Sequence, residues 1–346
     1  MKKLLSILLP MLLLITMTSC SDSDKNSSSV ESSVNITKAE RGFSVDGTKL
    51  LDANGNEFVM RGVNHAYAWY QSNTPEALDA IAKTGSNTVR IVLSNGTKTE
   101  GGNTWTKSDI DSVMNLIDEC KALKMIAVLE VHDPVGSDKM EDIEAAAQYW
   151  IDIKNALIGQ EEYVILNIAN EWSGCWETNS DTWTEGYTKV IPKLREAGIK
   201  NTILVDAAGW GQNVSSVQKR GTEVFESDPL KNTMFAVHFY GTAGGTAEKI
   251  EAALQGIQAH NLCVCVGEFG YDHTDGDVDE DFIMKYCTEK NIGYLAWSWK
   301  GNGSPVEYLD IAEDWGGKKL SSDWGEKLIN GEYGIKKTSK PCSVFE

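Results

Sequence analysis

The sequence predicts a single (β/α)8 barrel, and three observations favour this fold. Eight apolar, strand-forming runs alternate with amphipathic helical patterns, without a linker-like break. The runs are nearly all apolar, as in parallel strands that helices cover. Polar residues follow the runs at their C-terminal ends, where α/β barrels carry their chemistry. A doubly wound sheet is the alternative, but it usually has fewer strands and a glycine-rich phosphate loop, and no such loop follows the first strand here.

The predicted elements follow in strict alternation after a short N-terminal hairpin with turn signals at Asp46-Gly47 and Asn54-Gly55. The predicted strands are 59–64, 87–93, 125–131, 163–169, 202–206, 234–239, 262–267 and 292–298. The predicted helices are 75–84, 108–124, 139–158, 181–197, a short one at 213–220, 246–260, 278–290 and 322–330. Thr74-Pro75 and Ser108-Asp109 are typical helix starts.

The N-terminal residues are typical of an export signal. Met1-Lys-Lys begins a cationic segment, and the apolar run that follows to about Ile15 is too short for a comfortable transmembrane helix. The small residues before Cys20 resemble the lipobox of bacterial lipoproteins, which implies that Cys20 is lipidated. Residues 21–33 are too polar to fold. We expect a lipoprotein signal peptide over 1–19, a flexible tether over 20–38 and the folded domain over 39–346, anchored by lipid to the bacterial outer membrane or cell surface.

Composition narrows the partners. The chain has 50 Asp and Glu against 32 Lys and Arg, which argues against nucleic acid and suits a neutral substrate. The cysteine spacing fits no zinc template, and Cys263 and Cys265 share one face of a strand, as core residues do. The acidic run 275–280 fails the calcium-loop template and is expected to cap the next helix.

A glutamate follows two of the predicted strands: Glu171 comes two residues after the strand 163–169, and Glu268 comes directly after the strand 262–267. An acid/base carboxyl group paired with a nucleophilic carboxylate is the minimal equipment for glycoside hydrolysis. Each glutamate could instead simply start a helix. The strand ends supply further polar side chains, however, and together they predict one polar site at the mouth of the barrel: Asn64, His65, Arg90, His132, Asp133, Asn170, Asp206, His238, Tyr240 and Trp297.

This ordered set resembles the clan of retaining (β/α)8 glycoside hydrolases that includes family 5. The strings GVNHAYAWY, TVRIVLSNG, VLEVHD, ILNIANEW, LVDAAGWGQ, VGEFG and LAWSWKGNG resemble, in that order, the bacterial endo-β-1,4-mannanases of its subfamily 8. The resemblance runs from about residue 41 to 333. It makes residues 39–346 the expected catalytic domain.

The resemblance implies a role for each matching residue. Glu171 is the expected acid/base, Glu268 the nucleophile, and Asn170 the partner of the sugar 2-hydroxyl. Arg90 and Tyr240 would hold Glu268, and His132, His238 and Trp297 would surround the cleavage subsite. The other expected supporting or substrate-binding residues are Asn64, His65, Trp69, Trp172 and Trp210. Trp172 stands where many members have proline and is expected to add a stacking platform on the leaving-group side. Trp69, Trp105, Trp176 and Trp210 either line the cleft or pack under a loop. Asp133 either orients the His132 ring or is solvated.

The expected activity is retaining, endo-acting hydrolysis of β-1,4-mannosidic bonds in mannan, glucomannan or galactomannan, by a monomer that needs no cofactor or metal. An endo-β-1,4-glucanase on the same scaffold is the alternative, because the catalytic set does not distinguish axial from equatorial 2-hydroxyls. A second alternative is a surface glycan-binding protein that has no catalytic activity, but the presence of both glutamates argues against it.

Overall fold

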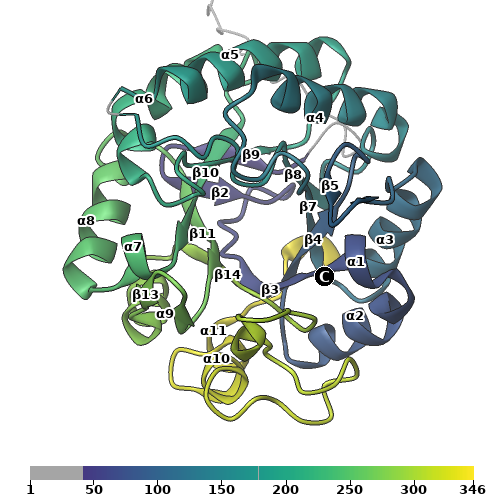
Figure 1. Cartoon of the computed structure of the whole chain (residues 1–346), viewed down its shortest axis with the longest axis vertical. Coiled ribbons are helices and arrows are strands. Elements are labelled where there is room, and N and C mark those ends of the chain that lie inside the picture. The colour runs from purple at the N-terminus through teal and green to yellow at the C-terminus, as the bar shows by residue number, and fades with distance from the viewer. Residues whose placement is uncertain (1–41, 178) are drawn as a thin grey trace, which may run out of the picture. The chain divides into compact units, whose positions relative to one another are not determined.

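The computed structural model describes residues 42–177 and 179–346, and these residues form the predicted barrel. Eight parallel strands close in the order β10-β11-β14-β3-β4-β7-β8-β9, and they form the central ring in Figure 1. The barrel strands are β3 (Arg61–His65), β4 (Thr88–Leu93), β7 (Ile126–Val131), β8 (Val164–Asn167), β9 (Ile203–Asp206), β10 (Thr233–Phe239), β11 (Val264–Phe269) and β14 (Gly293–Ala296). Each overlaps one of the predicted strands, so the fold prediction is confirmed.

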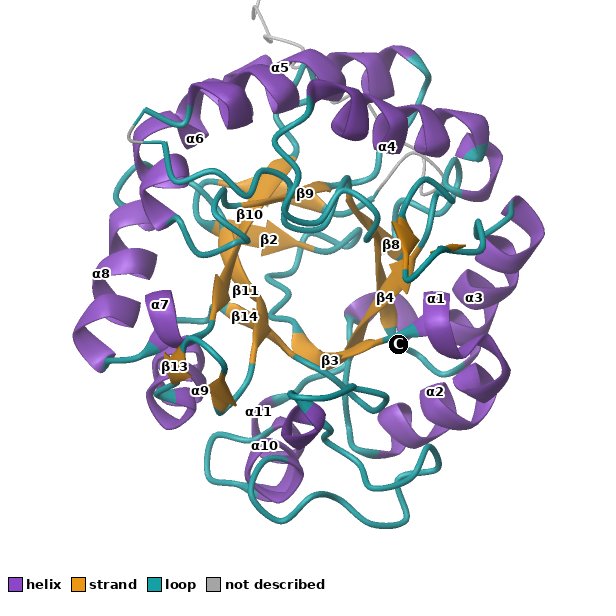
Figure 2. Cartoon of the chain, viewed as in Figure 1, coloured by secondary structure: helices purple, strands orange, loops and turns teal. Residues whose placement is uncertain are grey.

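The helices surround the strands, as Figure 2 shows. They are α1 (Tyr67–Tyr70), α2 (Thr74–Lys83), α3 (Ile110–Ala122), α4 (Met140–Asp152), α5 (Asp181–Glu196), α6 (Val214–Ser227), α7 (Gly241–Gly244), α8 (Ala247–Gln258), α9 (Glu280–Glu289), α10 (Gly325–Asn330) and α11 (Ile335–Thr338). Short 3-10 helices are η2 (Gln71–Asn73), η3 (Lys154–Ala156), η4 (Glu307–Leu309) and η5 (Ser343–Phe345). Asp279 caps α9 by accepting from the Phe282 amide, as expected of the acidic run before it.

The prediction for 213–220 was too short, because α6 continues to Ser227. The predicted helix stops just before Gly221. In the fold this glycine is a close-packing position: a Cβ there would lie 2.8 Å from Leu262 Cδ1. It therefore lets the helix approach its neighbour and does not end it.

The predicted N-terminal hairpin is β1 (Ser44–Asp46) with β2 (Lys49–Leu51). Phe43 and Leu50 pack with the side chains that fill the barrel interior, so the hairpin closes the N-terminal end of the barrel. Two further hairpins lie in loops, β5 (Thr99–Glu100) with β6 (Asn103–Thr104), and β12 (Asp272–His273) with β13 (Gly276–Asp277). With one end closed by apolar packing, the open mouth is at the other.

The predicted signal peptide, tether and lipidated Cys20 lie outside the described residues. Within 42–177 and 179–346, no helix has the length and apolarity to cross a bilayer. The cysteines in these ranges are all free thiols, and Cys263 and Cys265 are buried in the barrel interior, as predicted.

Candidate active site

The inward-facing positions of the barrel strands change from apolar to polar toward the C-terminal ends. Alternate strand residues share a face, so the residue two after an inward apolar position also points inward. Val128 is followed in this way by Glu130 on β7, and Ile165 by Asn167 on β8. Leu204 is followed by Asp206 on β9, and Ala236 by His238 on β10. The lower barrel is therefore an apolar core, and its upper layer is a polar site.

Glu268 is held by two donors, one on each carboxylate oxygen. Arg90 Nη1 donates to Oε1 at 2.8 Å and Tyr240 Oη donates to Oε2 at 2.9 Å. Burial raises the pKa of Tyr240 well above 10, and Glu268 and Glu171 raise it further, so this hydroxyl stays a donor. Two hydrogen bonds from different directions, one of them from a charged donor, fix the position of the Glu268 carboxylate.

Arg90 is fully buried and organises the layer beneath the site. Its guanidinium donates to the side-chain oxygens of Asn64, Asn167 and Asn170 at 2.7–2.8 Å. Burial by itself would lower the pKa of Arg90, but Glu130, Glu268 and Asp206 raise it above its ordinary value. Arg90 therefore remains a cation, and it fixes which way the Asn170 amide points.

Glu171 lies after β8 in a sharp turn with left-handed backbone, φ 48°. The turn is held because the Glu171 amide donates to Asp206 Oδ2 at 2.9 Å. Its carboxylate Oε1 lies 2.7 Å from His238 Nδ1. Burial by itself would lower the pKa of His238, but Glu268, Asp206 and Glu171 raise it to about 9. Below that pH, His238 is a charged donor to Glu171.

The two glutamates lie close together. One ligand atom each from Glu171, His238 and Glu268 lies within 4.8 Å of the others. Such a triad can hold a metal ion in principle, but here Arg90, Tyr240 and the imidazole already neutralise and bond the carboxylates. Retaining glycosidases have carboxyl groups about 5–5.5 Å apart, against about 6.5–9.5 Å in inverting ones. A carboxylate oxygen of Glu171 lies within 4.8 Å of one of Glu268, which is short of the inverting range and favours the retaining geometry.

His132 is oriented by Glu130, a residue that the sequence analysis missed. Glu130 Oε1 lies 3.0 Å from His132 Nδ1, and Nε2 faces Asn170 Nδ2 at 3.4 Å. The ring stacks on Trp297 at 5.8 Å between centroids. The signal was available, since Glu130 is the one charged residue in an otherwise apolar strand, two positions before His132.

A cleft of about 470 Å3 opens above these groups, lined by His132, Asn170, Glu171, Tyr240, Glu268 and Trp297 and by the exposed rings of Trp176 and Trp210. Trp69 is 38% exposed and meets the His132 ring edge-on at 5.1 Å. Trp105 packs against Trp69 at 5.0 Å. Trp176 and Trp210 thus line the cleft, and Trp69 borders it beside His132.

Three expectations about individual residues were wrong. Trp172 is fully buried beneath α5, against Tyr187 and the Gly186 backbone, so it offers no face to a sugar. His65 points away from the barrel axis, because it is one residue out of phase with inward Asn64, and its Nε2 bonds Thr74 Oγ1. Asp133 neither orients His132 nor is solvated; it binds the amides of Asn95, Thr97 and Lys98 and so holds the loop after β4.

Comparison with known proteins agrees with this geometry. Residues 51–303 match the family model Cellulase (glycosyl hydrolase family 5). A mannan endo-1,4-beta-mannosidase from Salipaludibacillus agaradhaerens is 50% identical over 304 residues, which are 88% of this chain and 96% of that protein. The mannotriose complex of the Thermomonospora fusca beta-mannanase superposes with a TM-score of 0.81 at 38% identity, covering 88% of this chain and 100% of that one. An endoglucanase from a Microbulbifer strain is 26% identical and covers 74% of this chain and 50% of that protein.

Proposed function

Because this chain belongs to glycosyl hydrolase family 5, we propose that it is a retaining endo-β-1,4-mannanase. The observation that carries the proposal is the facing pair Glu171 and Glu268, with Glu268 clamped between Arg90 and Tyr240. A protein that only binds glycans has no use for this paired arrangement, so catalysis is favoured over binding alone.

In the first step, Glu268 attacks the anomeric carbon and forms a glycosyl ester, while the glycosidic bond breaks. Glu171 gives its proton to the departing oxygen. His238 Nδ1 lies 2.7 Å from Glu171 Oε1 and positions this carboxyl group. Arg90 and Tyr240 hold the Glu268 carboxylate in position until the bond forms.

In the second step, Glu171 is a carboxylate and takes a proton from water as the water attacks the anomeric carbon. The ester bond to Glu268 breaks and its carboxylate is restored. Two inversions at one carbon give retention. Asn170 is positioned for the sugar 2-hydroxyl because its Oδ1 is committed to Arg90, leaving its amide nitrogen toward His132 and the cleft.

The substrate assignment rests on the relatives. The protein that is 50% identical is named a mannanase, whereas the endoglucanase is 26% identical. The test is reducing-sugar release from mannan and from carboxymethylcellulose, measured side by side. We expect much faster release from mannan; faster release from carboxymethylcellulose would favour the endoglucanase alternative.

We further propose that the enzyme acts as a monomer tethered to the cell envelope through lipid on Cys20. The cationic start, the short apolar run and the polar tether in the sequence support the anchor. A tethered enzyme would keep its oligosaccharide products near the cell surface.

A further inference from the structure

A second pocket of about 360 Å3 lies beside the catalytic cleft. The two are separated by the segment 306–309, which includes η4. Val306 and Leu309 line the catalytic cleft, whereas Glu307 and Tyr308 line the second pocket. One short segment is therefore a wall shared by both.

The second pocket also lies directly behind the cleavage subsite. The buried Trp324 at its floor donates from Nε1 to the Trp297 carbonyl oxygen at 3.1 Å. Asp310 on its side accepts from Asn302, which in turn accepts from the Trp297 indole at 2.8 Å. A ligand in this pocket would thus lie next to the residues that hold Trp297.

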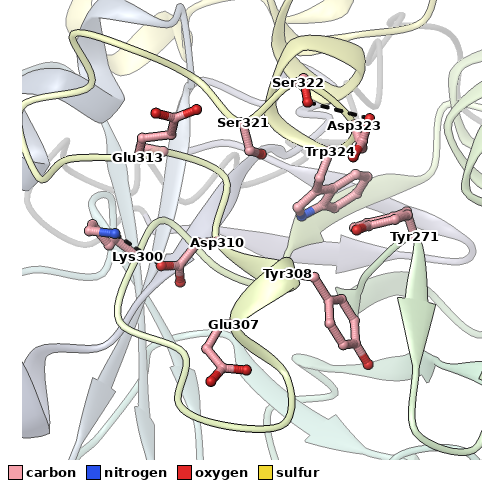
Figure 3. A pocket seen from close by; sticks show the side chains of 11 residues that line it. Tyr271, Lys300, Glu307, Tyr308, Asp310, Glu313, Ser321, Ser322, Asp323 and Trp324 are labelled. Carbon is pink, nitrogen blue, oxygen red and sulfur yellow. Dashed lines mark hydrogen bonds and ion pairs between the residues drawn. The ribbon is translucent and has the colours of Figure 1, made fainter.

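The lining combines aromatic rings with hydrogen-bond acceptors. In Figure 3, Tyr271, Tyr308 and Trp324 gather on one side, and Lys300, Asp310 and Glu313 lie on the other. The Tyr271 and Tyr308 rings are perpendicular, 5.9 Å apart, and both are half-buried. This pocket therefore offers apolar ring surface next to carboxylates.

Several of these groups have no partner. Within residues 42–177 and 179–346, the hydroxyls of Tyr271 and Tyr308 and the carboxylate of Glu307 make no hydrogen bond or ion pair. The cation in the pocket, Lys300, is bound to Asp310 at 3.1 Å. Glu313 is paired with Lys319, a residue outside the pocket lining. Among the described residues, Glu307 and Asp323 have no cationic partner and leave the pocket negative, which disfavours anionic ligands and suits hydroxyl donors.

We propose that this pocket is a second binding site for a neutral β-linked hexose chain, which it holds beside the catalytic cleft. The proposal rests on the proposed function for the identity of the chain, mannan. Tyr308 stacks on an apolar sugar face, and Glu307 accepts from sugar hydroxyls. The second binding site raises the affinity of the enzyme for the polymer, and it takes no part in bond cleavage.

The test separates polymer from short substrate. We expect Tyr308→Ala to lower kcat/KM on mannan about three- to tenfold, the worth of one aromatic contact, and to leave kcat/KM on mannotetraose unchanged. In a Glu268→Ala background, the same substitution weakens binding to insoluble mannan by a similar factor. Tyr308→Phe, which keeps the ring, retains most of the affinity.

Tyr163→Ala is the matched control, because Tyr163 is a half-buried tyrosine at the start of β8, at the opposite end of the barrel. If Tyr308→Ala does not fold, Glu307→Gln on an exposed side chain replaces it, with a smaller loss expected. An equal loss of kcat/KM on mannan and on mannotetraose would overturn the proposed binding site, and so would unchanged binding to insoluble mannan. Neither result would argue against mannanase activity. If the wild type does not cleave mannan, the proposed function fails. Binding of the wild type and of Tyr308→Ala is then compared on insoluble cellulose, and equal binding there also overturns the proposed binding site.

Discussion

The charge on His238 makes the stability of this protein depend on pH in a defined window. His238 faces Glu171 at 2.7 Å, Asp206 at 3.6 Å and Glu268 at 3.7 Å, and these carboxylates raise its pKa from 6.5 to about 9. The folded state therefore binds this proton more tightly than the unfolded state does. The resulting stabilisation is complete below pH 6.5 and is lost as the pH rises through 9.

The size of the effect follows from the two pKa values. A tenfold change in proton affinity is worth about 1.4 kcal/mol, so the shift from 6.5 to about 9 corresponds to about 3 kcal/mol. Buried thiols such as Cys263 and Cys287, whose pKa burial raises to about 12, add a further loss above about pH 9. The wild type and the variants share that loss, so the difference in their free energies of unfolding reports on His238 alone.

The assay is urea unfolding of the wild type and of His238→Gln at intervals between pH 6 and 10. We expect the wild type to lose about 3 kcal/mol more than the variant across this range. His65→Gln is the control. Burial lowers the pKa of His65 to about 4, so the protonation of His65 changes the stability only at pH values below 6.5. Above that pH, the curve of the His65→Gln variant should run parallel to that of the wild type. Parallel curves for wild type and His238→Gln would refute the proposed charge on His238.

Three further outcomes are expected. Tyr240→Phe removes one hydrogen bond to charged Glu268 and should lower kcat on mannan about ten- to a hundredfold, with an unchanged circular dichroism spectrum; full activity would show that Arg90 suffices. On an activated aryl mannoside with azide, Glu171→Ala should give the β-mannosyl azide and Glu268→Ala the α-azide, as read by NMR; swapped products would reverse the two roles. Cys20→Ala should move the protein out of the membrane fraction, and its continued presence there would argue against the lipid anchor.

Much of the barrel and of the site could be predicted from local patterns. Apolar runs that alternate with amphipathic segments predict parallel strands and the helices that cover them, and each of these patterns lies within a short stretch of sequence. The polar residues that follow apolar strands predicted a site at the mouth of the barrel, and Asn170, Glu171 and Tyr240 were placed there on this basis. Placing Trp172 in the cleft and His65 in the polar layer failed, because side-chain direction depends on the turn and on strand phase.

The position of Glu268 depends on the tertiary structure. Cys263 and Cys265 face the barrel interior, so strict alternation would place Gly267 inward and Glu268 outward. The pairing of β10 with β11 shifts between Val237 and His238, so that His238 lies opposite Glu268 and Gly267 is the extra residue. A Cβ on Gly267 would lie 2.9 Å from His238 Nε2, so glycine allows the close approach.

The sequence by itself therefore determined the eight strands, the identity of the polar residues at their ends and the hydrolase family that those residues resemble. Only the tertiary structure decided that Glu268 turns inward, that Glu130 orients His132 and that Trp172 is buried under α5. The physical reason is that strand and helix periodicities are local, whereas register shifts and cross-strand hydrogen bonds depend on residues far apart in the chain.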